Sequence, residues 1–267
     1  MYSVNWCRNV YRNLLERRCG EDGGMKGLKV MALAAVCLLT GCDDRFPDYH
    51  YKMTIYAGGK SYSSVRGVEQ EEVSSIQDSS GRTVHTKLQG QAVILDLPGG
   101  QTVYALLSGK DSPQQAQYIA GAALMPMIRK HEKDPRYDDL SSEPGDTMDE
   151  NAEDEQAMVK VAGPRDLPRV RTVNALGRPY AKPVPLWPMF VTFGDPKDPK
   201  TVREVSPDSI GVDRITIEIT DEDVTAGIEG RLGWLPDLHG KALVGGSFNM
   251  KSPLGLDAGK FSTELFK

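Results

Sequence analysis

The sequence predicts an α+β fold, built mainly on an antiparallel β-sheet with one principal helix packed on a face. Three observations lead to this prediction. Short segments alternate between apolar and polar residues, as half-buried strands do. Turn signals that contain glycine join neighbouring segments, and short turns make the joined strands antiparallel. A single stretch, residues 113–125, carries both a helix start signal and a helical apolar pattern.

The first and last predicted strands show the clearest alternation. Residues 49–56 place Tyr49, Tyr51, Met53 and Ile55 on one face, and residues 213–220 place Ile215, Ile217 and Ile219 on one face. Further strands are predicted at 61–68, 91–97, 102–107 and 189–193, with 84–88 as an additional candidate. Glycines 58–59 and the Pro-Gly-Gly turn at 98–100 are the signals that join the first two pairs.

The predicted helix begins after Ser112, which can cap it, and Pro113 occupies the first helical position, where a missing N–H costs nothing. Pro126 should end or kink it, because the proline ring clashes with the preceding turn. The stripe expected to be buried against the sheet comprises Tyr118, Ile119, Ala122, Ala123 and Met125.

An acidic segment divides the chain. Residues 131–160 contain 11 acidic and three basic side chains, and their apolar content is too low to offset the entropy cost of ordering. We therefore expect a mobile acidic loop at 131–160. Residues 42–130 and 161–267 are then the N-terminal and C-terminal β-rich parts of the same domain.

The N-terminal region contains the most specific motif. Lys26 and Lys29 precede an apolar run at 30–40, which at 11 residues is shorter than the roughly 20 that span a bilayer. The run ends in Leu-Thr-Gly-Cys at 39–42, and residues 25–42 resemble the signal peptide and lipobox of bacterial lipoproteins. The resemblance implies removal of the signal peptide 25–41, cleavage between Gly41 and Cys42, and lipidation of the Cys42 sulfur. The alternative is a buried N-terminal helix that ends in a chance cysteine.

This resemblance also implies a location. The chain would be anchored by lipid in the bacterial cell envelope, facing the periplasm, with the membrane as its partner through Cys42. Asp43 and Asp44 favour the inner over the outer membrane, because acidic residues at this place resemble the inner-membrane retention signal of enteric lipoproteins. Residues 1–24 are a polar segment that precedes the signal peptide. We therefore interpret them as an upstream-start artefact, with translation beginning at Met25. The alternative is a real cytoplasmic extension.

Composition and motifs exclude several classes of function. The net charge of −5 argues against nucleic acid as the main ligand, because phosphate binding favours a basic face. All four cysteines lie within the first 42 residues, so the body holds no disulfide framework and no cysteine-based zinc site. Nucleophile-elbow, phosphate-loop and zinc-protease motifs are absent from the sequence, and the acidic residues 221–223 fail the calcium-loop template. We expect no cofactor and no metal.

The leading interpretation is a non-enzymatic binding or assembly module, with another envelope protein as a candidate partner. The alternative is an envelope hydrolase whose site forms only in the fold, for instance a histidine with Asp96 or Asp195. Trp187 and Trp234 are expected in the core rather than on a partner surface. The segments QAVILDL, MFVTFGDP and DRITIEITDEDVT, in that order, also resemble uncharacterised proteobacterial envelope lipoproteins, a likeness that implies no activity.

Overall fold

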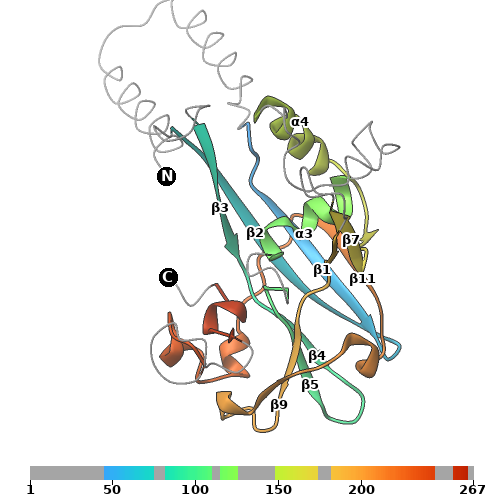
Figure 1. Ribbon diagram of the computed structural model, residues 1–267, viewed down its shortest axis with the longest axis vertical. Coiled ribbons are helices and arrows are strands. Elements are labelled where there is room, and N and C mark those ends of the chain that lie inside the picture. The colour runs from blue at the N-terminus through green and yellow to red at the C-terminus, as the bar shows by residue number, and fades with distance from the viewer. Residues whose placement is uncertain are drawn as a thin grey trace, which may run out of the picture. The chain divides into compact units, whose positions relative to one another are not determined.

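The computed structural model describes residues 45–74, 82–109, 115–125, 148–173, 182–243 and 255–263. Arg45–Lys267 form one compact unit, built around two larger antiparallel sheets and a two-stranded ribbon (Figure 1). The mainly antiparallel α+β architecture that the alternating segments predict is confirmed for these residues.

The larger sheet has five strands in the order β3, β2, β1, β11, β6, and all neighbouring pairs are antiparallel. Its strands are β1 (Tyr49–Ala57), β2 (Lys60–Ser74), β3 (Arg82–Gln89), β6 (Arg165–Asp166) and β11 (Val212–Thr220). In β1 every second residue is buried, as the alternation predicts. Met53 lies opposite Ile217 on one side and opposite Ser64 on the other, so the inner faces of β1, β2 and β11 coincide.

The smaller sheet has four strands in the order β10, β9, β5, β4, again antiparallel throughout. They are β4 (Val93–Asp96), β5 (Thr102–Ala105), β9 (Phe190–Phe193) and β10 (Val202–Glu204), and the separate ribbon pairs β7 (Val170–Val173) with β8 (Lys182–Pro185). Both faces of the smaller sheet are buried. Val103 and Ala105 contribute to the core shared with the larger sheet, whereas Tyr104 contributes to a second core.

The second core is closed by C-terminal segments rather than by another sheet. Short 3₁₀ helices at Ile228–Gly230, Pro236–Leu238 and Ala258–Lys260 supply apolar side chains to it, including the fully buried Ile228. Phe261 lies at its centre, with ring centroids 5.8 Å from Trp234, 5.9 Å from Phe193 and 6.2 Å from Tyr104. The contacts with Trp234 and Tyr104 are edge-on and the contact with Phe193 is tilted, and this aromatic packing helps to hold the described C-terminal segments on the smaller sheet.

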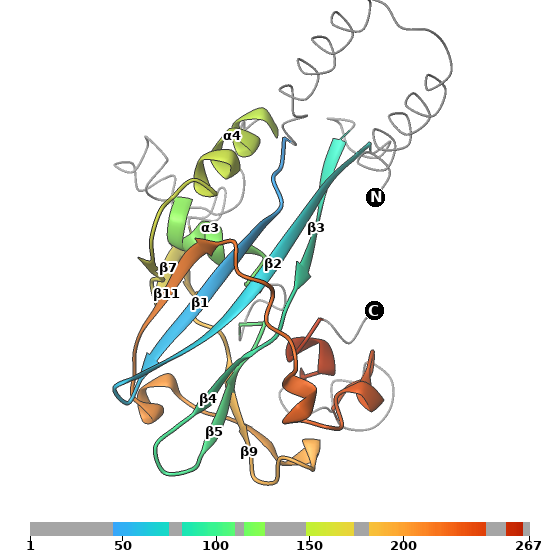
Figure 2. The same cartoon turned by 180° about the vertical axis from the view of Figure 1, so that it is seen from behind.

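Helix α3 (Gln115–Leu124) covers the inner face of the five-stranded sheet, and Figure 2 shows it behind the long strands. It matches most of the predicted helix, while positions 113–114 lie outside the described residues. Ile119, Ala122 and Ala123 are buried as expected. Tyr118 was expected to be buried and is 53% exposed, because it points away from the face on which Ile119 packs.

The prediction of one principal helix is not confirmed, because the described residues include a second helix, α4 (Met148–Met158). The loop predicted at 131–160 is therefore wrong for this part, while residues 131–147 lie outside the described residues. Met148–Met158 forms a helix because it is rich in alanine, glutamate, glutamine and methionine, which are strong helix formers. Ala152 and Met158 of this helix are buried, and Met158 belongs to the core that the two larger sheets share.

Candidate functional site

The predicted lipidation site, Cys42, and the predicted cleavage position, Gly41, lie outside the described residues. Within the described part, no helix is both long and apolar enough to cross a membrane. The structure describes the chain from Arg45, three positions after the cysteine, and at Arg45 the chain already contacts the folded domain. Phe46 is buried, and the carbonyl of Arg45 accepts a hydrogen bond from Nε2 of Gln156 at 3.2 Å.

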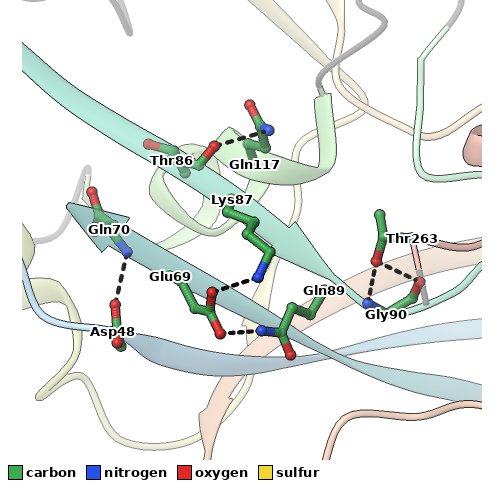
Figure 3. Close-up of polar contacts among 9 residues, drawn as sticks. All are labelled: Asp48, Glu69, Gln70, Thr86, Lys87, Gln89, Gly90, Gln117 and Thr263. Atoms are coloured by element: carbon green, nitrogen blue, oxygen red, sulfur yellow. Dashed lines mark hydrogen bonds and ion pairs between the residues drawn. The ribbon is translucent and has the colours of Figure 1, made fainter. Parts of the chain in front are cut away.

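Strand β2 holds the same segment from its other side. The backbone N–H of Gln70 donates to Oδ1 of Asp48 at 2.7 Å (Figure 3), and Nε2 of Gln70 donates to the carbonyl of Pro47 at 3.3 Å. The same Gln70 amide donates to Glu155 of α4, next to the buried Tyr49. Burial raises the pKa of Glu155, although the bond from Gln70 opposes this.

The two carboxylates considered for a hydrolase have structural partners. Asp96 accepts from Oγ1 of Thr102 at 2.9 Å and forms an ion pair with Arg231 at 2.5 Å. Oδ1 of Asp195 accepts from the backbone N–H of Lys197 at 2.9 Å, which is the local turn that Asp favours. Both carboxylates therefore take part in turn and surface contacts.

Histidine is the other residue type that the hydrolase alternative requires. Nδ1 of His50 lies 2.8 Å from the carbonyl of Glu222, whose carboxylate pairs with Lys52 at 2.6 Å. His85 is exposed on β3, and His131 lies outside the described residues. Among the residues that the structure describes, no group of three His, Cys, Asp or Glu side chains is arranged to hold a metal ion.

Both tryptophans pack with the domain. Nε1 of Trp187 donates to the carbonyl of Leu167 at 3.1 Å, and Arg169 lies over its ring at 5.0 Å. Nε1 of Trp234 donates to the carbonyl of Pro196 at 2.9 Å, and its ring packs against the second core. In each tryptophan the apolar ring packs against a core, and the ring N–H donates a hydrogen bond to a backbone carbonyl.

One buried charge was missed by the sequence analysis. Arg66 on β2 lies opposite Tyr51 in register, so its side chain shares the inner face of the sheet. Arg66 is 0% exposed, and Nε, Nη1 and Nη2 make no well-directed hydrogen bond, although the Tyr51 hydroxyl lies within hydrogen-bonding reach of the guanidinium. Gly90 covers the stem of this side chain so closely that a methyl group on it would lie 3.1 Å from Cγ of Arg66.

Tyr51 links this cation to α3. Its hydroxyl donates to the carbonyl of Ala116 at 2.6 Å, in the first turn of the helix. Burial raises the pKa of the Tyr51 hydroxyl, and the positive charge of Arg66 opposes the rise, so the two groups lie within electrostatic reach. The tyrosine thus supplies a polar neighbour to the guanidinium without supplying a negative charge.

Other buried polar groups nearby are satisfied. Oγ of Ser64 donates to the carbonyl of Gln91 at 3.1 Å, and the Gln91 side chain accepts from the backbone N–H of Ile228 at 2.9 Å. Among the described residues, the buried side-chain nitrogen and oxygen atoms without a partner belong to Arg66 and to Oε1 of Gln115. Buried polar atoms are normally paired, so the Arg66 guanidinium is the candidate functional group of the domain.

The comparisons with known proteins supply no relative for this site. The chain matches no family model, no curated protein and no solved structure. What the domain does must therefore be argued from its own residues.

Proposed function

We propose that the chain is a lipid-anchored envelope protein whose β-rich domain faces the periplasm and works as a non-enzymatic binding or assembly module. The observation that supports it best is the ordered succession in residues 25–42 of lysines, an apolar run too short to span, small residues and Cys42. Two or more acyl chains on such a cysteine anchor stably, because each buried methylene contributes about 0.8 kcal/mol.

The start of the folded domain gives this anchor a physical consequence. Only Asp43 and Asp44 separate Cys42 from Arg45, whose carbonyl is already bound by α4. Three residues of extended chain reach at most about 11 Å. A lipidated Cys42 would therefore hold the end of the domain formed by Arg45, the start of β1 and α4 close to the membrane surface. Another envelope protein at the same surface is the kind of partner that such a position favours.

Binding fits the described residues better than hydrolysis does. Asp96 and Asp195 are engaged in an ion pair and in a turn, whereas the feature without an internal explanation is the unpaired Arg66 cation. Such a group binds a ligand by charge and shape, without a proton to give or take. The acidic pair Asp43 and Asp44 favours the inner membrane as the place of anchoring.

Substitution of the cysteine tests the anchor. Cys42→Ser should abolish incorporation of radiolabelled palmitate and leave the precursor uncleaved, because serine lacks the thiol that accepts diacylglycerol. Cys37→Ser is the matched control, since it removes a cysteine five positions earlier within the apolar run and should label as the wild type does. Unchanged labelling and processing of Cys42→Ser would refute the lipoprotein proposal. The folded domain should be the same in all three proteins by circular dichroism.

A further inference from the structure

We propose that Arg66 is the receptor of an oxyanion-binding site on the inner face of the five-stranded sheet, and that the ligand is a small carboxylate- or phosphate-bearing anion. The inference gives the proposed binding module a ligand class. It rests on that proposed function only for its biological setting, because the geometry of Arg66 is independent of the anchor.

Arg66 carries a permanent charge. A guanidinium stays protonated at every pH that proteins experience, so Arg66 cannot escape the cost of burial by losing its proton. A buried charge without a partner is among the most expensive features that a fold can contain. Arg66 is fully buried, its nitrogens make no well-directed hydrogen bond, and the neighbouring Tyr51 hydroxyl is neutral. An anion that binds there would offset this cost and would be bound tightly for the same reason.

Several carboxylates of the described residues around β2 are engaged by groups other than Arg66. Glu69 is three positions from Arg66, on the other face of the strand, and its carboxylate engages Lys87 and Gln89 (Figure 3). Glu155 is engaged by Gln70, and Asp96 by Arg231. These carboxylates are therefore committed elsewhere. The groups near Arg66 on its own face are uncharged, namely Tyr51, Ser64 and Val68.

The shape of the Arg66 guanidinium indicates the chemistry of the ligand. Nε, Nη1 and Nη2 make no well-directed hydrogen bond, and the group beside them is the neutral Tyr51 hydroxyl, so the planar fork keeps donors for two oxygens of a carboxylate or a phosphate. Gly90 closes the side of the Arg66 stem, and Val68 with Leu88 lines the same face in apolar groups. This enclosure favours a small anion, and its low dielectric strengthens the pair.

Thermal unfolding of the full-length chain tests the proposal. In a buffer without oxyanions, phosphate and acetate are added separately while potassium chloride keeps the ionic strength constant. The wild type should melt roughly 5 to 10 °C higher at about 100 times the dissociation constant of the preferred anion. The phosphate and acetate series distinguish the two sources of the oxyanion.

Variants assign the effect to Arg66. Arg66→Met should lose the shift and, without anion, melt at least as high as the wild type, because an apolar side chain replaces an unpaired buried charge. Arg66→Lys keeps the charge but loses the fork, and should bind at least tenfold more weakly. Arg203→Met is the matched control, since it removes an exposed arginine on β10 and should keep the full shift.

Three outcomes would overturn the proposal. They are a wild type that responds to neither anion beyond the chloride control, a shift that survives in Arg66→Met, and an Arg66→Met that melts far below the wild type in the absence of anion. The last would show that the chain itself supplies the counter-charge. The same titration on Cys42→Ser separates the two proposals, because loss of lipid labelling with a retained shift removes the anchor alone. A lost shift with retained labelling removes the site alone.

Discussion

Replacement of Gly90 by alanine tests the enclosure of Arg66 directly. Gly90 joins β3 to β4 with φ of +129°, a conformation that residues with a side chain rarely adopt. A methyl group at this position would lie 3.1 Å from Cγ of Arg66, 3.3 Å from its Cα and 3.3 Å from the carbonyl oxygen of Val65. Two of these atoms belong to the backbone of β2, so the neighbour cannot simply rotate away.

The cost has two parts. A residue held at an unfavourable positive φ costs about 1–3 kcal/mol, and an extra methyl group in a closely packed site adds about 1–3 kcal/mol. Gly90→Ala should therefore lower the free energy of unfolding by about 2–6 kcal/mol, or the melting temperature by roughly 5 to 20 °C. The C-terminal segment is affected too, because three hydrogen bonds join Thr263 to Gly90. The Thr263 hydroxyl accepts from the Gly90 N–H at 2.8 Å and donates to the Gly90 carbonyl at 3.2 Å (Figure 3), and the backbone N–H of Thr263 donates to the same carbonyl at 2.9 Å.

Gly99→Ala separates the two parts. Gly99 has φ of +102° in the turn between β4 and β5, and a methyl group there would meet no atom within 4 Å. It should cost only the conformational part, about 1–3 kcal/mol. Chemical denaturation of both variants, followed by circular dichroism, measures the difference. If Gly90→Ala costs no more than Gly99→Ala, then the β3–β4 connection does not press on Arg66, and the enclosure argued for its ligand is wrong.

Two further predictions concern α4 and the second core. Burial raises the pKa of Glu155, so the folded state binds the proton more tightly than the unfolded state, and stability falls as pH rises from the ordinary glutamate range through the raised pKa. Glu155→Gln should remove this pH dependence and raise the melting temperature at pH 7. The control Glu153→Gln, at an exposed position of the same helix, should do neither. Equal melting behaviour of the two variants would contradict the prediction for Glu155. Phe261→Ala should cost about 3–5 kcal/mol in chemical denaturation, because a fully buried ring leaves a cavity among Trp234, Phe193 and Tyr104. Val170→Ala, at a 48% exposed site, should change stability by under about 0.5 kcal/mol, and a similar loss in both variants would show that Phe261 is not a core residue.

The strands that sequence alone could locate are those whose two faces differ. In β1 and β11 the alternation of apolar and polar residues is nearly uninterrupted, and the buried residues Tyr51, Met53, Ile215 and Ile217 are the ones that the pattern assigns to the core. A shift by one residue would expose all of them, so the pattern fixes the register as well as the strand. The order of strands in the sheets carries no such signal, because it depends on contacts between distant segments.

Helix α4 was missed because composition is an average. The acidic side chains of residues 131–160 dominate that average, whereas the helix is attached by a few positions, namely the buried Ala152 and Met158 and the hydrogen-bonded Glu155 and Gln156. The apolar residues that follow it, Val159 and Val161, pack against the same core. An acidic helix with one narrow apolar side and an acidic loop have almost the same composition, and only periodicity within a few turns distinguishes them.

Arg66 was missed for the opposite reason. The segment 61–68 is polar on both faces, so its alternation does not identify an inner side, and a charged residue in such a strand is normally assigned to solvent. Pairing with β1 decides the matter, because Tyr51 faces the core and Arg66 stands opposite it. A methionine or leucine at that position would be buried at a lower cost in folding free energy. The arginine therefore departs from the rules by which the rest of the sheet is built, and such departures occur where function rather than stability determines the residue.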